Sequence, residues 1–321
     1  MKNKCFWLAA ITCGVLTDVA AQSSADFPAK PVRVIVAVDT GSSSDIQARM
    51  FSQKLSENLK RQFFVENRPN YGQAYGSFIK SPADGYTLLA VASAFSIVPS
   101  LITTLPDPLK DYAPISLVNK APLLLLSHPS LPAKSVKELI ALAKSKSNEI
   151  AIGVTARGTL THLGAVLLAS GSDIKLNIIP YKGTGQIITD TMAGHIQVAF
   201  GNVIQNLSHA KSGRLRALAV TSTTRSSVVP DLPTIAESGV PGYDVTTWHG
   251  WLAPAATPPM ILARLSDELA RAVKAPEIAA RLIQDGVEPI GSTPEQFQQL
   301  LGAEVPRWRK IIKDIGLTNT D

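Results

Sequence analysis

Short runs of apolar, mostly β-branched residues recur along this 321-residue chain, with amphipathic segments between them. The first run, Val32 to Val38, is apolar except for one arginine, which is typical of a strand buried in a parallel sheet. After a polar loop, apolar residues return at near-helical spacing, and Ser44 or Asp45 is placed to cap the first turn of a helix. Alternating strands and helices build βαβ units, so the sequence predicts an α/β protein.

The same alternation continues through most of the chain. Further strands are predicted at Phe63 to Glu66, Tyr86 to Ala92, Leu123 to Ser127, Ile150 to Val154, Leu176 to Ile179, Val198 to Phe200 and Leu215 to Val220. Capping boxes open helices at Ser135 and Thr293. From Pro259 to Ile315 the chain reads as almost entirely helical, with breaks at Pro276 and at a short strand from Val287 to Ile290.

A helical tail of this kind is expected to pack back on an earlier domain. Roughly 300 residues exceed what a single core usually supports, so two domains are expected. We predict a discontinuous domain one, built from residues 28–122 and 252–321, and a domain two formed by residues 123–251.

The N-terminus has the pattern of a secretory signal peptide. Lys2 and Lys4 precede an apolar stretch from Cys5 to Leu16 that is too short to span a bilayer. Val19 and Ala21 are the small residues expected before a cleavage site. We therefore expect residues 1–21 to be removed and the mature protein to be periplasmic.

Both cysteines, Cys5 and Cys13, lie in the segment that is removed, so the mature chain has no disulfide, thiol nucleophile or thiolate metal site. Lipidation of Cys13 is an alternative, although Thr12 stands where glycine or alanine is preferred. The formal charge of +6 is spread thinly, without a basic run, which argues against nucleic-acid binding. A mild positive field is compatible with an anionic ligand.

Sequence signatures of enzymes are weak. Gly153 to Gly158 has the glycine spacing of a P-loop, but Thr159 replaces its lysine. The five histidines lack metal-site spacing, and no histidine lies near Gly41 to Ser44 in the sequence to act as a base. We predict no catalytic residue, metal or cofactor, and a triad assembled from distant residues stays open as an alternative.

Polar, glycine-containing loops precede three predicted helices, at Asp39 to Asp45, Thr155 to Thr161 and Tyr181 to Gln186. Free N–H groups and the positive end of the dipole make a helix N-terminus a ready carboxylate site. These loops are also compatible with ordinary α/β turns, and their spacing alone does not decide between the two interpretations.

A series of short motifs resembles one known family. They are Phe27-Pro28-Ala29-Lys30-Pro31-Val32-Arg33, Glu66-Asn67-Arg68-Pro69, Asp84-Gly85-Tyr86-Thr87-Leu88-Leu89, His128-Pro129-Ser130-Leu131-Pro132, Pro180-Tyr181-Lys182-Gly183, Pro230-Asp231-Leu232-Pro233-Thr234 and Trp251-Leu252-Ala253-Pro254. Because these motifs occur together and in this order, the chain resembles the Bug-type periplasmic receptors of tripartite tricarboxylate transporters. The resemblance implies a type II-like Venus-flytrap fold with crossing hinge strands. It also implies a monomer that captures a small carboxylate and passes it to two integral membrane subunits.

The resemblance also implies where a ligand is held, largely by backbone amides and water. Carried over by position, the expected ligand-binding residues are Thr40, Gly41, Ser42, Ser43, Asp45, Ser93, Ser96, Thr155, Arg157, Gly158, Thr159, Tyr181 and Asn202. Asp39 in the first loop and Gly201 before Asn202 depart from the family pattern. These departures leave the ligand's identity open.

Several of these residues have two interpretations. Asp45 is placed to stabilise a helix dipole or to contact a ligand ammonium or hydroxyl, and Arg157 is either a carboxylate clamp or an ordinary loop arginine. Trp248, His249 and Trp251 either fill the hinge or form a wall of the cleft, and hinge packing is favoured. A sensor that signals to a membrane kinase and a hydrolase that uses the same cleft are the alternative functions.

Overall fold

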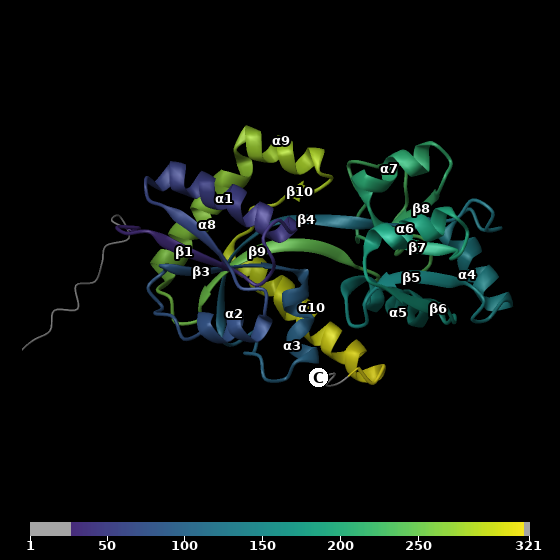
Figure 1. The fold of residues 1–321 in the computed structure, drawn as a ribbon, viewed down its shortest axis with the longest axis horizontal. Helices are drawn as coiled ribbons and strands as arrows, with labels where there is room; N and C mark the ends of the chain where they lie inside the picture. The colour runs from purple at the N-terminus through teal and green to yellow at the C-terminus, as the bar shows by residue number, and fades with distance from the viewer. Residues whose placement is uncertain (1–26, 318–321) are drawn as a thin grey trace, which may run out of the picture.

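The structure, a computed structural model, describes residues 27–317, so the predicted signal peptide at residues 1–21 lies outside the described residues. The strands form a curled 10-stranded sheet in the order β2-β1-β3-β9-β4-β7-β5-β6, with β8 and β10 also paired to β4. Helices cover both faces, which confirms the predicted α/β class (Figure 1). No helix among residues 27–317 has both the length and the apolar character needed to cross a membrane.

Lobe one is the half of the molecule built around β1 (Val32–Val36), which pairs in parallel with β2 (Phe63–Asn67) and β3 (Thr87–Ala92). Apolar side chains of α1 (Ser43–Leu59), α8 (Pro259–Lys274) and α9 (Pro276–Gln284) pack on one face of this sheet. The other face carries α2 (Tyr71–Phe78), η2 (Ser93–Ser96) and α10 (Pro294–Asp314). The short α3 (Val98–Leu101) and β10 (Glu288–Pro289) complete the lobe.

Lobe two is built around β5 (Ala151–Thr155), which pairs in parallel with β6 (Asn177–Tyr181) and β7 (Val198–Asn202). Its fourth strand, β8 (Arg216–Val220), pairs antiparallel with β4. One face packs against α4 (Val136–Ser145) and α5 (Leu160–Ser172), and the other against α6 (Thr184–Met192) and α7 (Val203–Lys211). Each lobe therefore has its own helix–sheet–helix core.

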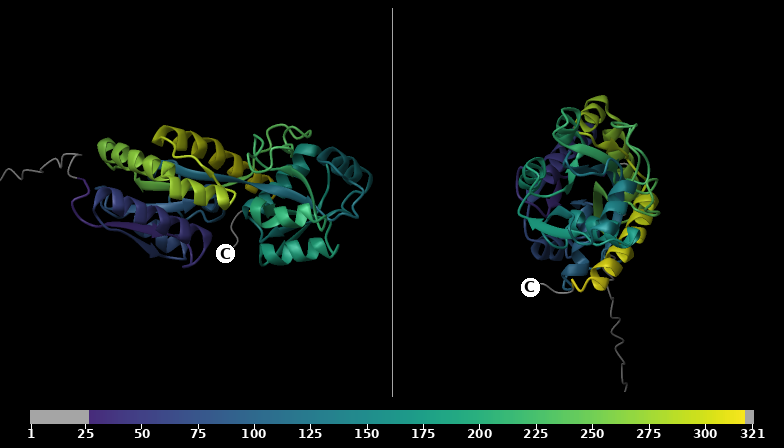
Figure 2. Two further views of the ribbon diagram at one scale, coloured as in Figure 1. Left: turned by 90° about the horizontal axis from the view of Figure 1, so that it is seen from above. Right: turned by 90° about the vertical axis from the view of Figure 1, so that its right-hand side faces the viewer.

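Two long strands, β4 (Tyr112–Ser127) and β9 (Thr246–Pro254), join the lobes (Figure 2). Residues 112–122 of β4 pair with β9, and from Leu123 onward β4 pairs with β7 and β8 of lobe two. The change of partner falls at the predicted domain boundary between 122 and 123. The boundaries themselves stay a prediction.

The last helix, α10, contacts both lobes. Phe297 and Leu301 near its start lie in the core of lobe one, whereas Trp308 and Ile312 near its end belong to the core cluster around α5 of lobe two. The predicted helical tail, with its breaks before Pro276 and at β10, is confirmed. Its assignment to domain one alone is not tested, because α10 spans the junction.

Most predicted helix starts agree with the structure. Ser135 caps α4, and Thr293 forms a capping box with Gln296 at α10. The predicted cap of α1 was wrong, since Ser42 and neither Ser44 nor Asp45 occupies the N-cap position. The hydroxyl of Ser42 accepts from the Asp45 N–H, so Asp45 already lies within the first turn.

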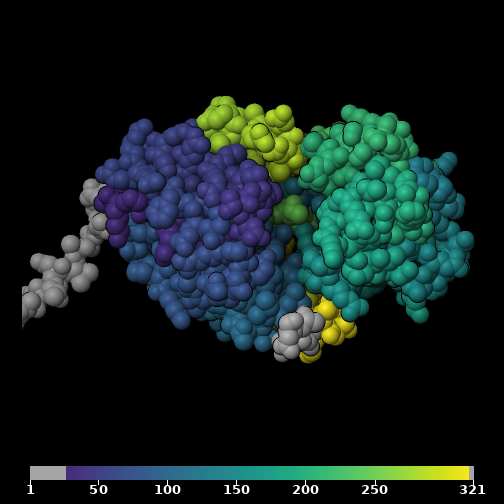
Figure 3. All heavy atoms as spheres, in the orientation of Figure 1, coloured from purple at the N-terminus to yellow at the C-terminus, as the bar shows by residue number. Residues whose placement is uncertain are grey.

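The space-filling view shows a hollow between the lobes (Figure 3). Part of a crossing strand, coloured green, is visible at its floor, and lobes one and two form its walls. This hollow is called the cleft below.

Candidate functional site

Each predicted ligand loop follows the carboxyl end of a parallel strand. β1 leads to Thr40 to Asp45, β3 to Ser93 to Ser96, and β5 to Thr155 to Thr159. Tyr181 ends β6 and Asn202 ends β7. Ligands of open α/β sheets bind outside the carboxyl ends of the strands, so these five segments occupy the expected position.

A pocket of about 360 Å³ lies between the two lobes. Lobe one contributes Ser93 and an apolar wall that includes Leu101, and lobe two contributes Arg157, Gly158 and Thr159. Four predicted site residues from two lobes therefore meet in one cavity. The remaining predicted residues do not line it: they are Thr40, Gly41, Ser42, Ser43, Asp45, Ser96, Thr155, Tyr181 and Asn202.

Asp45 holds the first loop in shape. Its carboxylate accepts hydrogen bonds from the Gly41 N–H at 2.8 Å, from Asn67 Nδ2 at 2.8 Å and from Arg49 Nε at 3.1 Å. Burial alone would raise the pKa of Asp45, but the hydrogen bonds from Arg49, Gly41 and Asn67 lower it. Because these partners all belong to lobe one, the structural interpretation of Asp45 is favoured, and its contact with a ligand stays a prediction.

The rest of the first loop is more open. Thr40, Gly41 and Ser43 are exposed, and Ser42 is half-buried as the N-cap of α1. The N–H groups of the first helical turn have no intrahelical acceptor. At Ser43 and Ser44 the loop therefore supplies backbone donors, whereas the Gly41 N–H is taken by Asp45.

Ser96 in the second loop faces the interior of the protein. Its hydroxyl donates to Glu304 Oε2 at 2.8 Å and lies 2.8 Å from the Ser93 carbonyl oxygen. Ser96 is fully buried, and it therefore positions η2 against α10. Its predicted contact with a ligand is not tested, but Ser93 is the residue of this loop that lines the pocket.

Threonine hydroxyls fix the third loop. The Thr155 hydroxyl lies 3.1 Å from that of Thr159 and 2.8 Å from that of Thr161, and the Thr155 N–H also donates to Thr161. The Gly158 N–H donates to Nδ1 of His162, whose pKa is lowered by burial and by the charge of Arg157. Arg157 itself is exposed and lines the pocket, so its guanidinium can reach a ligand.

The other two predicted residues of lobe two have local partners. The Tyr181 hydroxyl donates to Asp190 at 2.9 Å. Asn202 caps α7, because its Oδ1 accepts from the N–H groups of Ile204 and Gln205. No hydrogen bond in the structure connects either side chain with lobe one, among the described residues.

Gly201 is explained by its neighbour. A Cβ atom at this position would lie 2.6 Å from Nδ2 of Asn206, which is 2% exposed and donates to the Asn202 carbonyl oxygen. The Asn206 side chain therefore occupies the space that a larger residue at position 201 would need. A larger side chain at position 201 would therefore require Asn206 to move.

A polar chain that the sequence did not reveal lies where α1 meets the crossing strands. The Ser44 hydroxyl is 3.2 Å from Nε2 of His249 in β9, and His249 Nδ1 is 3.0 Å from Oδ1 of Asn119 in β4. Asn119 Nδ2 donates in turn to Gln47. Burial lowers the pKa of His249 to about 4, so its imidazole is neutral at pH 7.

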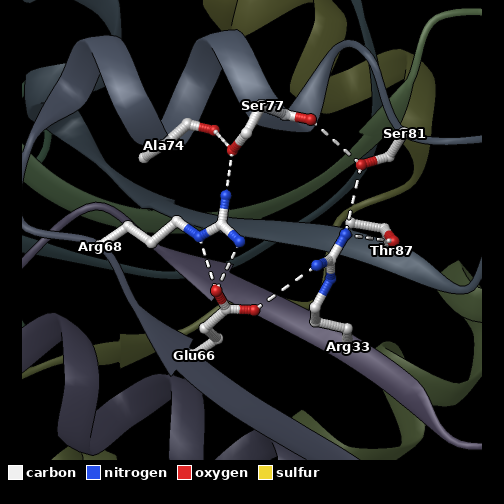
Figure 4. Close-up of polar contacts among 7 residues, drawn as sticks. All are labelled: Arg33, Glu66, Arg68, Ala74, Ser77, Ser81 and Thr87. Atoms are coloured by element: carbon white, nitrogen blue, oxygen red, sulfur yellow. Dashed lines mark hydrogen bonds and ion pairs between the residues drawn. The ribbon is translucent and has the colours of Figure 1, made fainter.

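The Glu66-Asn67-Arg68-Pro69 motif has a structural role. Arg68 donates to Glu66 at 2.6 Å and to the Ser77 hydroxyl of α2, and Glu66 also faces Arg33 of β1 (Figure 4). This network ties α2 to the sheet. It thereby fixes Tyr71 at the start of α2, whose side chain lines the pocket between the lobes.

Residues 47–317 match the family described as the tripartite tricarboxylate transporter family receptor. The chain belongs to this family. Protein BugT of Bordetella pertussis (strain Tohama I) is 34% identical to this receptor over 310 residues, which are 95% of this chain and 94% of that protein. The family predicted from the motifs is confirmed.

Solved structures of relatives have the same fold. R. palustris Rpa4515 with adipate is 31% identical to this receptor and superposes with a TM-score of 0.71, covering 91% of this chain and 99% of that chain. MatC from Rhodopseudomonas palustris with bound malate is 25% identical with a TM-score of 0.68, covering 89% and 100% of the two chains. The two-domain periplasmic binding protein fold is thus confirmed for the receptor.

Sequence reasoning about the receptor missed His249 as a candidate site residue. No local pattern connects the two residues, because His249 lies 205 positions from Ser44 in the sequence. Pairing of β9 with β3 and β4 brings it to the α1 loop, next to Ala92 and Asn119. Its position between two tryptophans of a predicted crossing strand is the sequence feature that could have indicated a site residue here. Those tryptophans, Trp248 and Trp251, are buried in the two core clusters of lobe one, and their packing in the hinge stays a prediction.

Proposed function

We propose that this chain is a periplasmic receptor that closes its two lobes on a small carboxylate and delivers it to a tripartite tricarboxylate transporter. The observation that carries the proposal is the pocket shared by Ser93 of lobe one and Arg157, Gly158 and Thr159 of lobe two. A ligand that touches both lobes binds the closed form better than the open form, and this difference in affinity drives closure.

The chemistry of the pocket suits a carboxylate. A guanidinium binds a carboxylate through two parallel N–H donors, and the N-terminus of α5, which follows Thr159, adds the positive end of a helix dipole. The apolar wall around Leu101 suits the carbon chain of the same ligand. Relatives solved with adipate and with malate support a dicarboxylate as the ligand.

The other parts of the proposal rest on the family and the sequence. Removal of residues 1–21 would release the mature chain into the periplasm. The partners are then two integral membrane subunits of the transporter, and the receptor acts as a monomer. The two bodies that move on closure are the predicted domains. Domain one consists of residues 28–122 and 252–321, and domain two consists of residues 123–251. The junction at β4 and β9 is their hinge.

Ser44 and His249 require a hydrolase to be considered, since a serine 3.2 Å from an imidazole is the arrangement of an activated nucleophile. A general base works best when its pKa lies near the working pH, and burial lowers the pKa of His249 to about 4. His249 is therefore a weak base at pH 7, and we assign this pair a hydrogen-bonding role. Release of nitrophenol from a 4-nitrophenyl ester by the wild-type protein, lost in Ser44→Ala, would favour the hydrolase instead.

A melting-temperature panel tests the receptor function. Succinate, malate, adipate, citrate, aspartate and benzoate are added to the mature protein at millimolar concentration. At 100 times its dissociation constant, a ligand stabilises the native state by about 2.7 kcal/mol. At least one acid is expected to raise the melting temperature and to be recovered unchanged. If no acid changes it, the proposal is wrong.

A variant pair locates the binding site. Arg157→Ala is expected to weaken binding of the active acid at least tenfold, because it removes a charge-assisted pair from the pocket. Arg214→Ala is the matched control, since Arg214 is also an exposed arginine of lobe two but does not line this pocket. Equal affinities in the two variants would place the carboxylate elsewhere.

A further inference from the structure

The pocket shared by the two lobes is lined mainly by apolar side chains. Four large ones follow β3 in lobe one and a fifth begins α5 in lobe two: Ile97, Val98, Leu101, Ile102 and Leu160. Ile97 is buried and Ile102 is 39% exposed, while the other three are half-buried. Small-molecule sites are typically concave and lined in this way, because an apolar ligand removes such side chains from water.

Tyr71 adds an aromatic ring to the same lining. The ring is half-buried and lies 5.5 Å from the ring of Tyr75, so packing within α2 helps to hold it in place. Burial raises the pKa of Tyr71, and its hydroxyl is therefore neutral at pH 7. Tyr71 thus offers area to an apolar ligand and contributes no charge.

Charge in this pocket is confined to one residue. Arg157 is the single charged side chain among the described residues that line it. The Thr159 hydroxyl already has local acceptors, since it lies 2.5 Å from the Thr155 carbonyl oxygen and 2.9 Å from that of Ala156. A ligand therefore finds one cation, the hydroxyl of Ser93 and a predominantly apolar surface.

The turn that carries Arg157 touches the apolar lining directly. A Cβ atom at Gly158, the next residue, would lie 2.8 Å from Cδ1 of Leu101 in lobe one. A carboxylate held by Arg157 therefore places the carbon skeleton attached to it beside Leu101.

We propose that the receptor selects a monocarboxylate with a continuous apolar body, either a medium-length alkyl chain or an aryl ring, and that it provides no cation for a second carboxylate. This inference rests on the proposed receptor function and names the substrate class of its site. The carboxylate pairs with Arg157, and the apolar body covers side chains of both lobes. Adipate can bind in the same way, through one carboxylate and its chain.

Short polar acids fit this pocket less well. The second carboxylate or the hydroxyl of malate or citrate would lie among Val98, Leu101 and Ile102, whose side chains form no hydrogen bonds. A polar group that loses water without gaining a partner weakens binding. The lining therefore favours hexanoate over citrate, although citrate carries more charge.

Titration calorimetry with butyrate, pentanoate, hexanoate and heptanoate tests the inference. Complete burial of one methylene group raises affinity about fourfold, so affinity is expected to rise about two- to fourfold at each step. Hexanoate is expected to bind at least as tightly as adipate, and more tightly than malate and citrate. A flat series, or tighter binding of adipate, malate or citrate than of hexanoate, overturns this inference and leaves the receptor function intact. Binding of none of these acids overturns both.

The heat capacity of binding gives a second readout that needs no variant. Burial of apolar surface makes the heat-capacity change negative, so its magnitude should grow from butyrate to heptanoate. A heat-capacity change that does not depend on chain length contradicts the proposal.

Variants assign the preference to this lining. The double variant Val98→Thr with Ile102→Thr is expected to lower the ratio of heptanoate to butyrate affinity at least about threefold, and to change butyrate affinity by less than about twofold. Ile283→Thr is the matched control, since Ile283 is a 56% exposed isoleucine of lobe one that does not line this pocket. An unchanged ratio in the double variant, or an equal fall in the control, contradicts the proposal.

Discussion

Glu304 Oε2 accepts a hydrogen bond from Trp248 Nε1 at 3.0 Å, and so links α10 to the crossing strand β9. The same oxygen accepts from Ser96, which brings the second ligand loop into contact with the hinge. Glu304 is 5% exposed, and burial raises the pKa of its carboxyl group. The hinge therefore contains an acidic group whose neutral form is favoured by its surroundings.

The first prediction concerns the charge of Glu304. A carboxyl group with a raised native pKa contributes stability that is present below its unfolded pKa and lost as pH rises through the native value. Glu304→Gln keeps an oxygen for Trp248 and Ser96 without a charge, and is expected to equal or exceed the wild type in unfolding free energy at pH 8. Glu304→Leu leaves Trp248 Nε1 without an acceptor, while Ser96 can still donate to the Ser93 carbonyl oxygen, and the variant is expected to lose about 1–3 kcal/mol. Urea unfolding of the three proteins measures this, and a Gln variant as unstable as the Leu variant would show that the charge is required.

The second prediction concerns Asp45, whose pKa is lowered by its hydrogen bonds despite burial. Its contribution to stability is present above the unfolded pKa and is lost as pH falls through the native value. Asp45→Ala is expected to lose about 2–3 kcal/mol at pH 7, since the Gly41 N–H and Asn67 lose their acceptor. Denaturant unfolding at pH 7 checks this, with exposed Asp39→Ala as the control that should change stability little. Equal stabilities in the two variants would mean that Asp45 does not hold the loop.

The third prediction concerns the pH dependence that comes from His249. An unfolded histidine titrates near pH 6.5, while burial lowers the native pKa of His249 to about 4. Between these two pH values the unfolded chain binds a proton that the native protein does not. The free energy of unfolding therefore falls as pH drops below ~6.5, by up to about 3 kcal/mol. Urea unfolding at pH 7.5 and pH 5 should show a smaller loss in His249→Phe than in the wild type. An identical loss in both proteins would assign this pH dependence to other groups.

Much of the fold could be predicted because the strands of each lobe are continuous apolar runs. The first half of β4 could not, since Pro114, Ser116, Asn119 and Pro122 interrupt its pattern. Proline usually marks a sheet edge or bulge, and the register of β4 against β9 does shift between Pro114 and Ser116. The strand persists because pairing with β9 and packing against α8 and α10 outweigh local propensity.

The candidate site could be predicted only in part. The loops after β1, β5 and β6 could be predicted because a strand followed by a polar loop is a local pattern, whereas Ser93, Ser96 and Asn202 were carried over from the family resemblance. The sequence could not show which donors are already used, as at Gly41 and Ser96, since their partners Asp45 and Glu304 depend on side-chain geometry. Contacts between distant segments, such as Ser44 with His249, depend on strand order, which a single sequence does not specify.

The fourth prediction concerns the approach of the lobes at Gly158. This glycine has a φ of +79°, and a Cβ atom there would lie 2.8 Å from Leu101 of lobe one. Gly158→Ala is expected to lower stability by about 1 kcal/mol and to weaken ligand binding, because it separates two walls of the pocket. The double variant with Leu101→Ala should recover part of the affinity but not the stability. Calorimetry and melting of the two variants check this, and wild-type affinity in Gly158→Ala would show that the two walls need not meet.

Closure on a carboxylate is tested most directly by small-angle scattering with and without the tightest-binding dicarboxylate of the melting panel at saturating concentration. Because the pocket is formed by Ser93 of lobe one and Arg157 of lobe two, the bound protein is expected to have a smaller radius of gyration than the free protein. Arg157→Ala at the same ligand concentration should stay closer to the free value. An unchanged radius in the saturated wild-type protein would contradict capture of the solute between two moving lobes.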